Sequence, residues 1–278
     1  MLNNQSLLEL KTLEHLLKCM KIIGDDTIQR TQLTHRIELV KTFQVKKGMK
    51  VLEIGCGQGD TTVVLADAVG ETGHIVAIDI ASPEYGAPIT LGEAAETISQ
   101  SPLGQRIDFH FETDFLQMAF DEKFDVIVLS HCSWYFESIE LLKNYLQKIK
   151  QVADRICFAE WDIDYTLESQ RAHFCAANIA LLYTAFTEND GNIQNLFHKT
   201  QIKELMHSEG FLITLEQTVD ASYLQDGLWE VDYSNYLLNE FPEVPTKIQS
   251  LIHSYAYLMN EQAKPPLSLN SFVLCADL

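Results

Sequence analysis

The sequence lacks long hydrophobic runs and any excess of basic charge. None of its apolar runs reaches the roughly 18 residues that a membrane-spanning helix requires, and its N-terminus has no signal-peptide pattern. Only 20 lysines and arginines stand against 39 aspartates and glutamates, which gives the 278 residues a net charge of -19. Because phosphate backbones and anionic membranes attract basic faces, we expect neither nucleic acid nor a membrane as a partner.

Paired cysteine motifs are missing as well. The six cysteines are scattered without a C-x-x-C pair, and several stand in apolar runs, where a thiol packs as a small hydrophobe. This pattern argues against a metal site and against a disulfide framework. It favours a reducing environment, so we expect a cytoplasmic protein.

A glycine-rich turn follows the first apolar strand of the sequence. The run 51–54 predicts a buried parallel strand, residues 61–66 have helical character, and Gly55, Gly57 and Gly59 stand between them. Strand, turn and helix in this order form ligand pockets at the carboxyl ends of strands in open α/β sheets. The spacing G-x-G-x-G differs from the G-x-G-x-x-G of pyrophosphate binders, so the turn alone does not name its ligand.

Strand and helix patterns alternate along the chain on both sides of this turn. This alternation predicts an α/β fold with a doubly wound, mostly parallel, seven-stranded sheet. The further strands are predicted at 74–79, 106–111, 124–130, 155–159, 211–219 and 271–276, and the helices between them at 90–100, 141–152, 168–186 and 202–208.

Helical segments outside the alternation are predicted as caps. Two amphipathic helices, over 5–23 and 27–43, either cover a ligand cleft or complete the core. Helical segments near 228–239 and 246–262 belong to either an inserted cap or an oligomer surface, so a homodimer stays open. The predicted organisation is an N-terminal helical cap segment (1–45), a cofactor-binding α/β core (46–162), a helical lid (163–200), a core continuation (201–219), a helical insertion (220–268) and the last core strand (269–278).

The order of these signals resembles the class I S-adenosyl-L-methionine-dependent methyltransferases. The glycine motif, residues 51–59, is followed by Asp79 at the end of the second strand, by Asp114 after the third, and by the run 124–131. The resemblance covers roughly residues 30–160. It implies a Rossmann-like fold, S-adenosylmethionine as the cofactor and methyl transfer as the activity.

The resemblance also implies roles for acidic and apolar side chains. The acid at Glu53 attracts the ammonium group of the ligand, and the acid at Asp79 accepts both ribose hydroxyls. Asp114 meets the adenine amino group, while Phe115 and Ile80 sandwich the ring. Asp79 could equally just end a strand, and Asp114 could cap a helix. The implied cofactor-binding residues are Glu53, Gly55, Cys56, Gly57, Gln58, Gly59, Asp79, Ile80, Asp114, Phe115 and Ser130.

The acceptor is expected beyond the fourth strand. His131 is the nearest general base by chemistry, or else it hydrogen-bonds the backbone and shapes the pocket. Trp134 and Tyr135 either line the acceptor pocket or pack in the core. Glu160 and Asp162 follow the fifth strand, where they could orient a hydroxyl or an amine, or bind a cation.

The missing motifs narrow the substrate class. No Asn/Asp-Pro-Pro-Tyr/Phe follows the fourth strand, so methylation of adenine or of glutamine amides is not expected. A small-molecule acceptor remains, with its O, N or C atom undetermined. The alternatives are a catalytically inactive scaffold or sensor and an aminopropyltransferase-like enzyme, which would want an acid where Ser130 and His131 stand.

Overall fold

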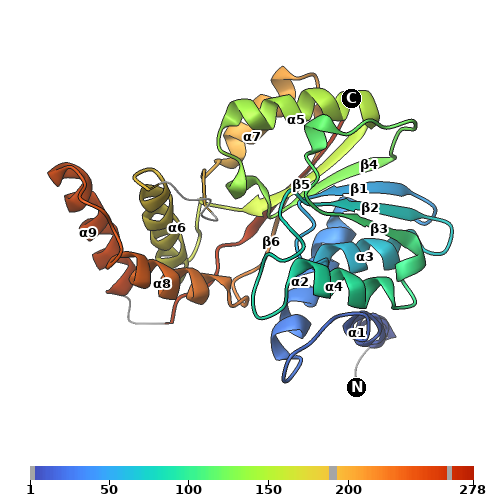
Figure 1. The fold of residues 1–278 in the computed structure, drawn as a ribbon, viewed down its shortest axis with the longest axis horizontal. Coiled ribbons are helices and arrows are strands. Elements are labelled where there is room, and N and C mark those ends of the chain that lie inside the picture. Colours follow the sequence, from blue (N-terminus) through green and yellow to red (C-terminus); the bar gives the residue numbers. More distant parts are fainter. Residues whose placement is uncertain (1–3, 188–192, 262–264) are drawn as a thin grey trace.

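Seven strands form one sheet between two layers of helices (Figure 1). The computed structural model describes residues 4–187, 193–261 and 265–278. The strand order is β3-β2-β1-β4-β5-β7-β6, in which β7 runs antiparallel to both of its neighbours and the other pairs are parallel. The predicted doubly wound, mostly parallel sheet is confirmed. The strands are β1 Lys50–Ile54, β2 His74–Ile78, β3 Ile107–His110, β4 Val126–Ser130, β5 Arg155–Trp161, β6 Leu212–Val219 and β7 Ser271–Asp277.

Alternate residues of each strand face the two helical layers. Val51 of β1 packs in one apolar cluster and its neighbour Leu52 packs in the other, as the two-residue period of a strand requires. Both faces of the sheet are therefore covered at its centre, which explains why β1, β4, β5 and β7 are buried along nearly their whole length. One layer holds α1 Asn4–Leu17, α2 Thr27–Phe43, α3 Asp60–Val69 and α4 Leu91–Ser99, and the other holds α5 Ile139–Val152 and α7 Lys199–Ser208.

The N-terminal helices complete the core. Helix α2 has the predicted bounds, and its Leu33 and Phe43 are fully buried in the cluster that contains α3. Helix α1 ends at Leu17, earlier than the predicted residue 23. The structure thus shows that this segment contributes to the core, and its covering of a ligand cleft stays a prediction.

Three helices project from one end of the sheet (Figure 1). Helices α8 Asp226–Leu237 and α9 Thr246–Asn260 lie between β6 and β7 in the sequence, and they pack against α6 Arg171–Thr184. Since β6 and β7 are themselves paired, residues 220–268 are an insertion between neighbouring strands. In the part of the chain that the structure describes, no helix is long and apolar enough to cross a membrane.

Strand β5 is longer than its apolar run predicts. The run was expected to end at Ala159, but the strand continues to Trp161, because Glu160 and Trp161 pair with Phe272 and Ser271 of β7. The side chain of Glu160 is therefore fixed by a strand rather than carried on a loop.

Candidate active site

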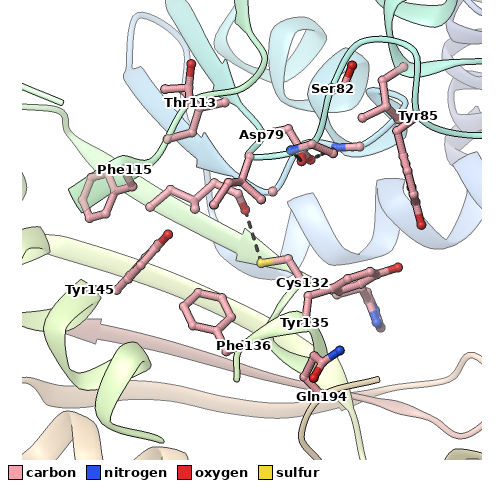
Figure 2. Close-up of a pocket in the computed structure, with 18 of the residues that line it drawn as sticks. Asp79, Ser82, Tyr85, Thr113, Phe115, Cys132, Tyr135, Phe136, Tyr145 and Gln194 are labelled. Carbon is pink, nitrogen blue, oxygen red and sulfur yellow. Dashed lines mark hydrogen bonds between the residues drawn. The ribbon is translucent and has the colours of Figure 1, made fainter. Parts of the chain in front are cut away.

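A cavity of about 1200 Å³ opens at the carboxyl ends of β1, β2 and β4. Figure 2 shows Asp79, Ser82 and Tyr85 on one side of it, and Cys132, Tyr135 and Phe136 on the other. Pockets for single small ligands usually measure roughly 300–1,000 Å³. The cavity is therefore larger than a usual pocket for one small ligand.

The cavity brings together part of the predicted site. The predicted residues that line it are Gly55, Gly57, Asp79, Ile80, Phe115, His131 and Tyr135. The remaining predicted residues lie outside its lining: Glu53, Cys56, Gln58, Gly59, Asp114, Ser130, Trp134, Glu160 and Asp162. Their contacts with ligands stay predictions.

The glycine turn passes close to the loop after β4. Gly55 has φ +75°, and a Cβ at this position would lie 2.6 Å from Cβ of Cys132, so a side chain is excluded. At Gly57, with φ +52°, a Cβ would meet nothing within 4 Å. The backbone of Gly57 thus borders open space in the cavity, where a ligand can approach it.

Asp79 ties the end of β2 to the glycine turn. Its Oδ2 accepts the N–H of Gly57 at 2.8 Å, and its Oδ1 accepts the N–H of Ala81 at 2.9 Å. An ionised carboxylate has about four acceptor positions, so these bonds leave capacity for ligand hydroxyls. Ending the strand and binding a ligand are compatible roles for this side chain.

Glu53 lies beneath the turn rather than in the cavity. It is 1% exposed, and its Oε2 accepts the hydroxyl of Thr62 at 2.6 Å. Burial raises the pKa of its carboxyl to about 8, although the hydrogen bond from Thr62 and the charge of Arg36 act in the opposite direction. In the ligand-free protein at pH 7, this carboxyl group therefore carries a proton.

Two other residues of the glycine motif have structural partners. The Nε2 of Gln58 donates to the carbonyl of Ile89 at 2.6 Å, and the N–H of Cys56 donates to the carbonyl of Ile78 at 3.1 Å. Both contacts join the turn to neighbouring segments.

Asp114 caps a short 3-10 turn, which agrees with the alternative that this residue caps a helix. Its Oδ1 accepts the N–H of Leu116 at 2.8 Å, and its Oδ2 accepts Nε2 of Gln117 at 3.0 Å. The next residue, Phe115, is 1% exposed and packs its ring 5.2 Å from that of Tyr145, whereas Ile80 is 69% exposed at the cavity.

His131 begins the loop after β4 in a left-handed conformation, with φ +53°. Its Nε2 lies 3.0 Å from Oγ of Ser271, and its Nδ1 faces Oε1 of Glu160 at 3.4 Å. Burial lowers the pKa of this imidazole below its usual value, so the ring is neutral at pH 7. It lines the cavity while both of its nitrogens face protein groups.

Glu160 fixes the loop after β4 through hydrogen bonds to Ser133. Its Oε2 accepts both the N–H of Ser133 at 2.9 Å and the Ser133 hydroxyl at 2.7 Å, while Oε1 accepts the N–H of Trp161 at 2.9 Å. Burial acts to raise the pKa of this carboxyl, but His131 and these donors outweigh it, and the pKa falls below its usual value. Glu160 is therefore a buried, ionised carboxylate.

Asp162 and Trp134 also have protein partners. Asp162 is buried, and its Oδ2 accepts a hydrogen bond from Nζ of Lys199 at 3.0 Å. Trp134 is buried with Trp161 in an apolar cluster, and its carbonyl accepts the N–H of Gln194 at 2.8 Å. Trp134 does not line the cavity itself. Its carbonyl helps to position Gln194, which does line it.

Several lining residues carried no signal in the sequence that pointed to this cavity. They include Tyr85, Tyr145 and Gln194, whereas Cys132 and Phe136 lie in the segment 130–136 where the acceptor was expected. The loop that contains Tyr85 is longer than most strand–helix links and could have been suspected, but Tyr145 looks like any apolar helix position. Within residues 4–187, 193–261 and 265–278, no cluster of three metal-binding side chains occurs.

Comparisons with known proteins assign this architecture to a family. A family model described as a methyltransferase domain matches residues 45–210. The crystal structure of a cyclopropane-fatty-acyl-phospholipid synthase-like protein from Lactobacillus casei ATCC 334 is 34% identical, with a TM-score of 0.89 over 96% of this chain and 99% of that chain.

More distant relatives include one sequence match and one solved structure. Methyltransferase phomM from Diaporthe leptostromiformis is 29% identical over 175 residues, which are 54% of this chain and 45% of that protein. The chain thus spans about half the length of this curated relative. A magnesium protoporphyrin IX methyltransferase from Synechocystis PCC 6803, solved with bound S-adenosylhomocysteine, is 13% identical, with a TM-score of 0.50 over 99% of this chain and 95% of that chain.

Because Glu53 is protonated in the folded protein, we expect the free energy of unfolding to depend on pH. The folded protein, in which the pKa of this carboxyl is raised from 4.5 to about 8, retains a proton that the unfolded chain releases. The free energy of unfolding therefore falls as the pH rises through this window. Glu53→Gln removes this contribution, so urea unfolding between about pH 5.5 and about pH 8.5 should give the variant a flatter profile than the wild type.

The matched control is Glu71→Gln, which changes an exposed glutamate and should keep the wild-type slope. Parallel profiles for the wild type and Glu53→Gln would show that the buried carboxyl does not contribute.

Proposed function

This chain belongs to the class I S-adenosylmethionine-dependent methyltransferase family, and we propose that it methylates a small-molecule acceptor bound in the cavity at the carboxyl ends of β1, β2 and β4. The observation that carries the proposal is the cavity itself. Its volume of about 1200 Å³ accommodates two ligands, and the family's glycine turn and strand-end acid border one side of it. The loop that begins at His131 borders the other side.

The cofactor side is formed by the glycine turn and the segment after β2. The open space beside Gly57 allows a ligand to lie against the backbone, and the free acceptor capacity of Asp79 suits ribose hydroxyls. Ile80, which is 69% exposed, supplies apolar surface for a flat ring, and Phe115 borders the same cavity with only 1% of its surface exposed. When bound there, S-adenosylmethionine supplies an electrophilic methyl group on a sulfonium centre.

The acceptor side is formed by the loop after β4 together with Tyr145 and Gln194. Tyr135, Phe136 and Gln194 offer apolar area and a polar amide, a mixture typical of small-molecule sites. Displacement at a methyl group needs the attacking atom held in line, and positioning supplies about 7–11 kcal/mol of such barriers in favourable cases. The rigid loop therefore contributes mainly by orientation.

An oxygen or nitrogen acceptor also loses a proton during the reaction. His131 is the cavity-lining residue that we assign as the general base, because its imidazole is neutral at pH 7. To take up the proton of the acceptor, its Nε2 must exchange the contact with the Ser271 hydroxyl for that proton. The alternative is that His131 only forms part of the cavity wall.

Binding and turnover separate the competing functions. Calorimetry with S-adenosylmethionine should show binding, and transfer of a radiolabelled methyl group should then identify an acceptor in a metabolite panel. The panel includes acyl lipids, because the Lactobacillus casei relative is named after a fatty-acyl-phospholipid synthase. Binding without transfer to any acceptor would favour the scaffold or sensor. Absence of binding would overturn the proposal.

Replacing the strand-end acid tests the cofactor side. Asp79→Ala removes a charged acceptor of ligand hydroxyls and releases the N–H groups of Gly57 and Ala81. We expect the dissociation constant for S-adenosylmethionine, measured by calorimetry, to rise at least tenfold, about 1.4 kcal/mol. Asp154→Ala, which changes an exposed acid paired with Lys123, should retain wild-type affinity. An unchanged affinity in Asp79→Ala would place the cofactor elsewhere.

Replacing His131 tests the acceptor side. His131→Ala should lower kcat by about 10²- to 10⁴-fold if the imidazole is the base, while the affinity for S-adenosylmethionine changes little. His253→Ala, which changes an exposed histidine of α9, is the control and should keep the wild-type rate. A wild-type rate in His131→Ala would leave this residue as cavity wall.

A further inference from the structure

A chain of polar side chains links His131 to the N-terminal helical layer. Oγ of Ser271, at the start of β7, lies 3.0 Å from Nε2 of His131 and also 3.0 Å from Nε2 of His35 in α2. At the other end of the chain, Nδ1 of His131 faces Glu160 of β5. The order is His35, Ser271, His131 and Glu160, and only His131 of these lines the cavity among the residues that the structure describes.

All four side chains are shielded from solvent. His35 and Ser271 are 0% exposed, Glu160 is 1% exposed, and the side chain of His131 is 7% exposed. Buried polar groups are normally satisfied by one another, and hydrogen bonds strengthen where bulk water is excluded. The protonation pattern along the chain is therefore set by its members rather than by solvent.

The Ser271 hydroxyl permits only two arrangements of protons. It has a single hydrogen, and both of its neighbours are ring nitrogens. It either donates to His131 and accepts from His35, or donates to His35 and accepts from His131. Since both rings are neutral and each carries one proton, this choice fixes which nitrogen of each ring is protonated.

Glu160 has the larger influence on the choice between the two arrangements, because it carries a full charge, whereas the group that faces the other nitrogen of His35 is the neutral backbone carbonyl of Asp220. Its carboxylate is ionised and already accepts N–H and O–H groups of Ser133 and Trp161. An N–H at Nδ1 of His131 would be attracted to this carboxylate, whereas a lone pair at the same nitrogen would be repelled. The attractive arrangement leaves a single lone pair on the ring of His131, at Nε2, where it accepts the hydroxyl of Ser271.

We propose that Ser271 and His35 are positioning residues that, together with Glu160, hold His131 as its Nδ1–H tautomer and oppose protonation of its Nε2. His35 donates its Nε2–H to Ser271, and Ser271 donates its hydroxyl to Nε2 of His131. The hydroxyl stabilises the neutral ring, while Glu160 stabilises the protonated one. Helix α2 and strand β7 thus become part of the acceptor side of the site. The kinetic consequence rests on the proposed function; the tautomer does not.

Other charged groups around His131 act in both directions. Arg36 of α2 opposes protonation of the imidazole, whereas Asp226 of α8 favours it along with Glu160. His173 of α6 and His35 also interact electrostatically with the ring. These groups are unchanged in a Ser271 variant, so they do not obscure its effect.

Nitrogen NMR of the ligand-free protein tests the tautomer directly. Long-range ¹H–¹⁵N spectra of histidine-labelled chain at about pH 7.5, assigned with His131→Gln and His35→Gln, distinguish an Nδ1–H from an Nε2–H ring. We expect His131 as Nδ1–H and His35 as Nε2–H. The opposite pair of tautomers would overturn the proposal even if the protein binds S-adenosylmethionine as a methyltransferase.

Removing the hydroxyl tests its regulatory role. In Ser271→Ala the neutral form of His131 loses its donor, so its pKa in the NMR titration should rise by roughly half to one pH unit. If the enzyme is active, the base-dependent limb of kcat should move upward by the same amount. A pKa that stays unchanged or falls would overturn the proposal.

Matched variants separate this effect from a general loss of packing. Ser268→Ala removes another fully buried hydroxyl of the same segment, which bonds backbone groups of Leu224 and Gly227, and it should leave the His131 titration unchanged. His35→Gln retains a side-chain N–H donor to Ser271 and should leave the His131 titration unchanged. His35→Leu lacks this donor and weakens the hydrogen bond from Ser271, so the pKa of His131 should rise while its tautomer stays the same. Equal titrations for Gln and Leu would exclude His35 from the chain.

Discussion

The buried carboxylate of Glu160 is the constraint on which the acceptor side of the cavity depends. An ionised group with 1% exposure is stable only when several donors surround it. Ser133 and Trp161 supply these donors, and their bonds fix the turn that follows β4. Tyr135 and Phe136 reach the cavity from this same turn. Glu160 therefore shapes the cavity through a loop rather than by touching its contents.

The fold could be predicted because its determinants are local. Each buried strand is a short apolar run, and the turn at Gly55 and Gly57 marks the crossing to α3. The end of β5 could not be predicted, because Glu160 and Trp161 join the strand only through β7. A pairing between distant segments leaves no trace in the hydrophobic pattern of either one.

The site residues also differ in whether local sequence signals could predict them. Asp79 and His131 follow strands directly, so their place at the cavity follows from the motif order. Tyr145 and Gln194 reach the same cavity from an ordinary helix and from a distant segment, which no spacing rule connects. Burial also decides the chemical state of a residue. Glu53 has the residue type that a carboxylate role requires, yet its environment beneath the turn raises the pKa to about 8.

The insertion between β6 and β7 has a consequence for folding. Strand β7 lies inside the sheet, between β5 and β6, and it joins Arg155 to Asp277 across 122 positions of sequence. Contacts of such high sequence separation form slowly, because a long loop must close before they stabilise anything. Until then β5 and β6 each present an unpaired edge, the kind of surface at which partly folded chains associate. Assembly of the acceptor side, which needs Ser271 of β7 beside His131, thus depends on this long-range pairing.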